Sequence, residues 1–214
     1  MTKKVNTPET DVIIDAKGKL ELLFEKYGKK LLIVLVVIGV AVGGYFIYKG
    51  YAENKEQERI AKSEAAATSM LINDSAEDAK AVAENKEFNE TAAKNFANYV
   101  AAARYLNEGD IDAAEAYIAK FSNIEDGYLG AMVNAAACAI RGDIAVARGN
   151  NEAAIAAFQK AIETSNDDYT FISMNEKMGR LYTKMGNREE SVKCYKAIAD
   201  RFPDMEADYA KYIW

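Results

Sequence analysis

The sequence predicts an all-α protein in which a single N-terminal transmembrane helix precedes a solenoid of about three helical hairpins with a C-terminal capping helix. Three observations predict this fold. Residues 31–48 form an apolar run without charge or proline, and the whole chain has only two prolines. Gly109, Gly149 and Gly186 are each followed by Asp or Asn, at spacings of 40 and 37 residues. A period in this range is typical of stacked helical hairpins.

The apolar run 31–48 has the length of a membrane span. As a helix its 18 residues rise about 27 Å, close to the ~30 Å hydrocarbon core of a bilayer. The rival interpretation is a secretory signal peptide, which has a shorter apolar stretch followed by small residues at a cleavage site. Here a leader of 30 residues precedes the run, and bulky Tyr45, Phe46 and Tyr48 end it. We therefore interpret the run as an uncleaved anchor.

The basic residues beside the run predict its orientation. Lys26, Lys29 and Lys30 precede it and Lys49 follows it, so the positive-inside rule places the N-terminus in the cytoplasm. The predicted organisation is a cytoplasmic leader with an amphipathic segment (1–30), a transmembrane helix (31–48), a helical stalk (49–73) and a repeat domain (74–214).

Gly39 and Gly43 form a GxxxG sequence inside the predicted span. Two glycines at this spacing let membrane helices approach closely. Glycine is common in membrane spans, so coincidence is the alternative. We expect helix packing here, with a partner's span or with a second copy of this chain as a homo-oligomer.

Composition argues against enzymatic and nucleic-acid functions. The net charge of −6 predicts repulsion from nucleic acid. The chain has no histidine, which removes the commonest general base and metal ligand, and we expect no cofactor and no metal. A tethered enzyme could use acidic pairs such as Asp167-Asp168, but such pairs are usually solvated surface. Cys138 and Cys194 are either free and buried or joined in a disulfide.

The repeated units carry a family resemblance. The last unit has Met178-Gly179, Tyr182, Gly186-Asn187, Tyr195 and Pro203, and the middle one has Gly142, Gly149-Asn150, Ala154, Phe158 and Ala161. These spacings resemble the tetratricopeptide repeat over residues 95–203, with departures at Ser191 and Ile198. The match is weakest in the first unit, and a generic Ala-rich helical bundle is the alternative.

The physical roles of these positions agree with the resemblance. Gly142 and Gly179 would let the two helices of a hairpin approach closely, and Gly149 and Gly186 can adopt the positive φ that ends a helix. The last residues, from Asp204 on, predict a helix that covers the open end of the stack.

The resemblance implies a concave groove that binds other proteins. Its candidate partner-binding residues are Phe96, Tyr99, Leu106, Asp143, Glu176 and Arg180, together with Ala103, Ala139, Val146 and Thr183. This set is apolar in its first half and charged in its last half, with a net acidic character. Such a groove suits extended or amphipathic polypeptide segments. In the alternative interpretation, Phe96, Tyr99 and Leu106 pack against the stalk.

The layout of leader, span, stalk and repeats also resembles the single-span ancillary subunit of the bacterial SecYEG translocon. That resemblance implies a bacterial inner-membrane protein with its C-terminal domain in the periplasm. Its partners would be translocon subunits, secreted or envelope proteins and periplasmic chaperones. The sequence thus predicts a membrane-anchored, non-enzymatic adaptor. The alternative is a structural scaffold subunit of a cell-envelope assembly or division complex.

Overall fold

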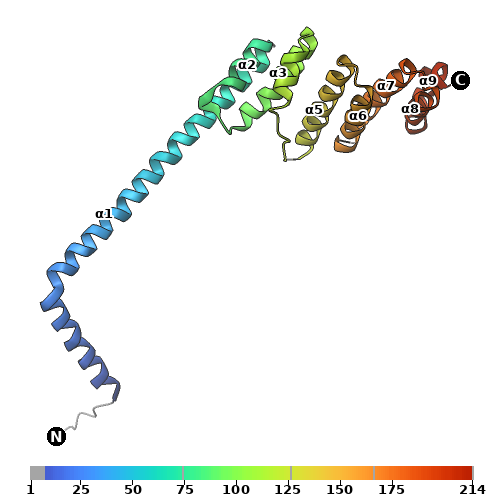
Figure 1. Ribbon diagram of the computed structural model, residues 1–214. Coiled ribbons are helices and arrows are strands. Elements are labelled where there is room, and N and C mark those ends of the chain that lie inside the picture. The colour runs from blue at the N-terminus through green and yellow to red at the C-terminus, as the bar shows by residue number, and fades with distance from the viewer. Residues whose placement is uncertain (1–7, 74, 126, 166, 214) are drawn as a thin grey trace, which may run out of the picture. The chain divides into compact units, whose positions relative to one another are not determined.

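The computed structural model describes the backbone of residues 8–73, 75–125, 127–165 and 167–213, and side chains from residue 36 onward within these ranges. The chain divides into two compact units, Met1–Glu58 and Arg59–Trp214. Within the described ranges every regular element is an α-helix or a short 3₁₀ helix (Figure 1). The all-helical prediction is therefore confirmed.

Helix α1 (Pro8–Asn73) contributes to both units. In the first unit, the large apolar side chains from Val36 to Tyr51 are exposed, with Val40 at 70% and Ile47 at 77%. The predicted span of 31–48 begins among residues whose side chains lie outside the description, so the transmembrane assignment stays a prediction.

The last turns of α1 belong to the helical domain. Ser63 and Met70 are 0% and 1% exposed, and Met70 lies in a core cluster with Ala79 and Val82 of α2 (Ala76–Glu84). The Arg59 guanidinium donates to the carbonyl oxygens of Glu87 and Asn89, next to the 3₁₀ helix η1 (Lys86–Phe88). The compact unit thus begins at Arg59, earlier than the predicted domain start at residue 74.

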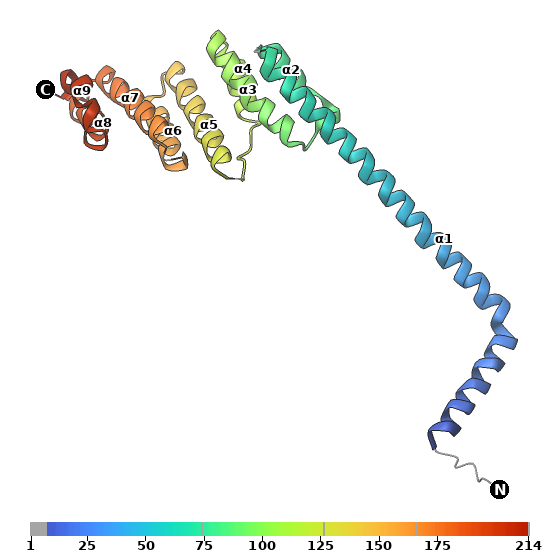
Figure 2. The same cartoon turned by 180° about the vertical axis from the view of Figure 1, so that it is seen from behind.

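Three helical hairpins follow in chain order. They are α3 (Ala92–Glu108) with α4 (Ile111–Ile118), α5 (Gly127–Ala147) with α6 (Asn151–Ser165), and α7 (Asp168–Lys184) with α8 (Arg188–Arg201). The 3₁₀ helix η2 (Pro203–Met205) leads into α9 (Glu206–Ile213). Each hairpin packs against the next, and Figure 2 shows the same stacking from behind.

Glycine in the left-handed region ends the first helix of each hairpin. Gly109, Gly149 and Gly186 have φ of 84°, 76° and 77°, which other residues adopt only at a cost. The residue after each glycine is the N-cap of the next helix. For example, the side chain of Asp110 accepts a hydrogen bond from the N–H of Ala113 at 3.0 Å. The positive φ predicted at Gly149 and Gly186 is confirmed.

Helix α5 is the described helix that is long and apolar enough to cross a membrane, with a mean hydropathy of 1.3. Its residues Ala135, Ala137 and Cys138 are buried within the stacked hairpins. Burial in a core accounts for this composition as well as a membrane would. Cys138 and Cys194 are free and buried.

The first hairpin departs from the pattern of the other two. Its second helix, α4, has 8 residues, against 15 in α6 and 14 in α8. A segment without regular secondary structure follows α4, and the side chains of two asparagines bind its backbone. Asn95 bonds the N–H and the carbonyl oxygen of Ser122, both at 2.8 Å. Asn134 does the same at Ile124, at 2.9 and 2.8 Å. This shortening explains why the first unit matches the repeat pattern poorly.

Helix α9 covers the end of the stack, as predicted. Tyr209 is 5% exposed and packs with Met205 and Ile213 in a cluster around Ile198. The Tyr212 ring stacks on Tyr195 with centroids 4.4 Å apart.

Candidate polypeptide-binding groove

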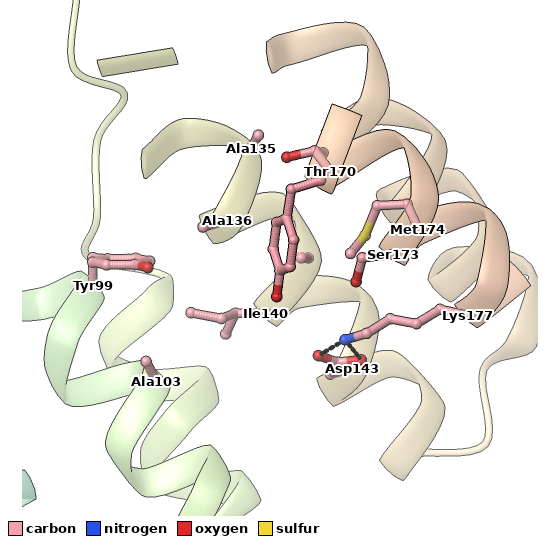
Figure 3. Close-up of a pocket in the computed structure, with 12 residues that line it drawn as sticks. Tyr99, Ala103, Ala135, Ala136, Ile140, Asp143, Thr170, Ser173, Met174 and Lys177 are labelled. Carbon is pink, nitrogen blue, oxygen red and sulfur yellow. Dashed lines mark hydrogen bonds and ion pairs between the residues drawn. The ribbon is translucent and has the colours of Figure 1, made fainter. Parts of the chain in front are cut away.

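The first helices of the three hairpins line a hollow of about 230 Å³. Figure 3 shows side chains from α3, α5 and α7 converging on it. Its lining consists of Tyr99 and Ala103 from α3, of Ala135, Ala136, Ala139, Ile140 and Asp143 from α5, and of Tyr169, Thr170, Ser173, Met174 and Lys177 from α7. Small side chains on α5 leave the space open, because alanine fills little of the gap between neighbouring hairpins.

Tyr99 forms one wall of this hollow and also supports the first hairpin. Its ring lies 5.7 Å from that of Phe96 and 5.9 Å from that of Phe121 between centroids. Desolvation by burial raises the pKa of the Tyr99 phenol, so the hydroxyl is a neutral hydrogen-bonding group at physiological pH. Tyr99 thus lines the hollow and also packs against Phe96 and Phe121, and its role in partner binding stays a prediction.

A second hollow of about 220 Å³ continues the first toward the C-terminal ends of α5 and α7. Val146, Phe158 and Leu181 provide its apolar lining. Asp143 and Lys177 line both hollows. The two hollows thus adjoin at the Asp143–Lys177 pair, and we call them together the α5/α7 furrow.

Cations line the second hollow, the part of the α5/α7 furrow nearest the C-terminal ends of α5 and α7. Lys177 Nζ contacts Asp143 Oδ1 at 2.7 Å and Oδ2 at 2.5 Å, a pair visible in Figure 3. Arg180 and Lys184 line the second hollow with Lys177, against the single carboxylate of Asp143. The predicted net acidic character is therefore wrong for this furrow. Lys177 and Lys184, which line the hollow beside α5, were not among the predicted residues.

The carboxylate of Glu176 is engaged by the capping helix rather than by the furrow. The Tyr209 hydroxyl donates to Glu176 Oε1 at 2.8 Å, and Arg180 lies 3.4 Å from Glu176 Oε2. Burial, and then the hydrogen bond to Glu176, raise the pKa of Tyr209 to about 12. This contact joins α9 to α7.

The structure places the predicted site residues in four groups. Tyr99, Asp143 and Arg180 line the α5/α7 furrow, as do Ala103, Ala139 and Val146. Phe96 and Leu106 pack partly buried against the core of the first hairpin, and Glu176 and Thr183 line neither hollow. Gly39 and Gly43 lie on α1, with nothing described within 4 Å of where a Cβ would be.

None of the five residues by which α7 lines the first hollow was predicted. They are Tyr169, Thr170, Ser173, Met174 and Lys177. Their spacing of three or four residues was a usable signal, because residues at this spacing share one helix face. The described residues contain no group of three His, Cys, Asp or Glu side chains that could hold a metal ion.

Two segments match models of the tetratricopeptide repeat. One covers residues 135–168, from within α5 through α6, and the other covers residues 176–204, from within α7 through α8. The first hairpin lies outside both matches. Comparison with curated proteins gave no match, and comparison with solved structures gave none.

The two matches support the interpretation of this chain as a tetratricopeptide-repeat protein. Such repeats generally mediate binding to other proteins, and the proteins that carry them are typically non-enzymatic scaffolds. The second and third hairpins, whose first helices form the α5/α7 furrow, are the two that match.

Proposed function

We propose that this protein is a membrane-anchored adaptor that holds extended polypeptide segments in the α5/α7 furrow. The observation that carries the proposal is the pair of adjoining hollows, with an apolar part beside Ile140 and Met174 and a charged part beside Lys177. Extended segments bind through apolar contacts for affinity and through a few polar groups for specificity.

The anchor is part of the same proposal. Val36, Ile38, Val40, Phe46 and Ile47 are more than half exposed, and no described side chain covers them. So many large apolar side chains in water would be unfavourable, since each costs about 1.5–3 kcal/mol relative to burial. A bilayer around residues 31–48 would remove this cost.

The resemblance to the translocon's ancillary subunit suggests where this adaptor works. In this proposal the N-terminus is cytoplasmic and the repeats lie in the periplasm of a bacterial inner membrane. The polypeptides bound would be secreted or envelope proteins, or chaperones near the translocon. The short apolar part of the furrow supports this partner class, because chains emerging from a translocon expose apolar segments before they fold.

Photocrosslinking in intact membranes tests the proposal. A photoreactive amino acid replaces Ser173 in the furrow, or Ala156 on the exposed face of α6 as a matched control. We expect crosslinks to polypeptides from Ser173 and few or none from Ala156. Equal crosslinking from both positions would show that the furrow is not the binding surface. Capture of one partner at constant stoichiometry would favour the scaffold alternative.

A further inference from the structure

We propose that the α5/α7 furrow selects extended segments in which small apolar residues adjoin two acidic residues separated by one residue. This inference rests on the proposed function and specifies the chemistry of the bound segment. It follows from the row of cations on α7 and from the apolar lining beside that row.

Lys177, Arg180 and Lys184 lie three and four residues apart on α7 and all line the second hollow. Lys177 is paired with Asp143 at 2.5 Å, while Arg180 makes an exposed 3.4 Å contact with Glu176. Lys184 is exposed and lines the same hollow. Arg180 and Lys184 are therefore the two cations best placed to bind carboxylates of a ligand.

The spacing of Arg180 and Lys184 fits an extended chain. Four residues of α-helix rise about 6 Å. In an extended segment, side chains two residues apart lie on the same face, about 6.6 Å apart. Two acidic residues separated by one residue would therefore have about the same spacing as Arg180 and Lys184. A C-terminal carboxylate would supply its charge at one point only, so we assign the recognition to side-chain carboxylates within a segment.

The apolar part of the furrow fixes the rest of the segment. From Ala135 to Val146, α5 rises about 16 Å, the length of about five extended residues. The alanines of α5 and the side chains of Ile140 and Met174 accept apolar groups of modest size. A segment of about five to seven residues would place its apolar part here and its acidic pair beside α7.

Peptide binding to the full chain in detergent micelles tests this inference by fluorescence anisotropy. The probe is a labelled peptide with blocked ends, Leu-Ala-Gly-Glu-Ser-Glu-Gly. The first control replaces both Glu by Gln, and the second places the two Glu side by side. We expect the Gln control to bind about fivefold more weakly, because it loses two partly exposed ion pairs. The control with adjacent Glu residues should bind about twofold more weakly, because one of its two carboxylates can still reach a cation. The difference should shrink in high salt.

Variants of the protein test whether the preference for the Glu-Ser-Glu peptide arises in the furrow. Lys184→Gln should weaken binding of the Glu-Ser-Glu peptide about twofold to threefold and leave the Gln peptide unchanged. Lys160→Gln, on the exposed face of α6, removes the same charge away from the furrow and should change neither. Lys184→Glu should instead prefer a peptide whose second Glu is replaced by Lys.

Equal binding of the Glu and Gln peptides would overturn this inference, as would equal effects of Lys184→Gln and Lys160→Gln. Crosslinking from Ser173 reports separately on whether the furrow binds polypeptide at all. If Ser173 crosslinks to polypeptides but the Glu and Gln peptides bind equally, this inference is wrong and the proposed function stands. If Ser173 gives no crosslinks and the two peptides bind equally, both the inference and the proposed function are wrong.

Discussion

Phe158 occupies the space that a Cβ on Gly142 would need. Its Cε1 and Cδ1 atoms press against the backbone of α5 at Gly142, and Phe158 is only 1% exposed. The third hairpin repeats the arrangement, where Tyr195 Cζ lies 2.7 Å from the position of a Cβ on Gly179. In both hairpins a glycine on the first helix lets an aromatic ring of the second helix approach its backbone closely. This contact sets the distance between the two helices.

The first prediction concerns this contact. Gly142→Ala should lower the free energy of unfolding by about 1–3 kcal/mol, because the added methyl group overpacks the core against a ring with no room to move. Gly50→Ala is the control, since nothing described lies within 4 Å of its Cβ position. There the substitution should be neutral or slightly stabilising. Chemical denaturation measures both, and an unchanged midpoint for Gly142→Ala would contradict the close approach.

The second prediction concerns the turns. Gly186 has a φ of 77° and open space around it. Gly186→Ala should therefore cost about 1–2 kcal/mol through backbone strain alone. Gly186→Asn should cost less, because asparagine tolerates this conformation. Thermal unfolding of both variants checks the order, and equal losses would argue against a conformational cause.

The third prediction separates the two roles of Tyr99. Tyr99→Ala should destabilise the protein by about 2 kcal/mol, because the ring packs against Phe96 and Phe121. It should also weaken peptide binding. Arg180→Ala, at an exposed position, should weaken binding while changing stability by less than about 0.5 kcal/mol. Melting and anisotropy on the same samples measure both effects. If both variants bind the peptide as tightly as the unmodified protein does, the α5/α7 furrow is not the binding surface.

The fourth prediction concerns high pH. Burial, reinforced by hydrogen bonds to Glu77 and Glu176, raises the pKa values of Tyr105 and Tyr209 to about 12. An unfolded tyrosine has a pKa of about 10. Between these values the folded state holds more protons than the unfolded state, so stability is complete below about pH 10 and falls as the pH rises toward 12.

Denaturant unfolding at pH 9 and pH 11.5 measures this loss. Tyr105→Phe and Tyr209→Phe should each make it smaller, because phenylalanine has no proton to lose. Tyr169→Phe is the control, since Tyr169 is 80% exposed. A loss that stays the same in all three variants would assign the pH dependence to other groups.

The fifth prediction concerns the anchor. Val40→Asp places a charge among the exposed apolar residues of α1, where a charge at the centre of a span costs about 2.5–3.5 kcal/mol. The variant should be partly released by alkaline extraction of membranes, whereas Ala156→Asp on α6 should not be. Complete release of the unmodified protein would refute the transmembrane assignment.

Much of the fold follows from the sequence alone, because its signals are local. A helix ends where Gly149 or Gly186 takes a positive φ, and the next begins where Asn150 or Asn187 caps it. The period of these pairs fixes the number of hairpins. Gly142 and Gly179 indicate close contacts between helices, because glycine has no Cβ atom that would prevent such an approach.

Only the tertiary structure decided the composition of the groove. The spacing of residues on α7 indicates which of them share a helix face, but not which face lies beside α5. In the structure Lys177 and Lys184 line the hollow beside α5, while the Tyr209 hydroxyl binds Glu176. The shortening of α4 was equally hidden, because Asn95 and Asn134 hold the following segment through contacts between separate elements. Turns depend on neighbouring residues, whereas a groove depends on the packing of helices far apart in the chain.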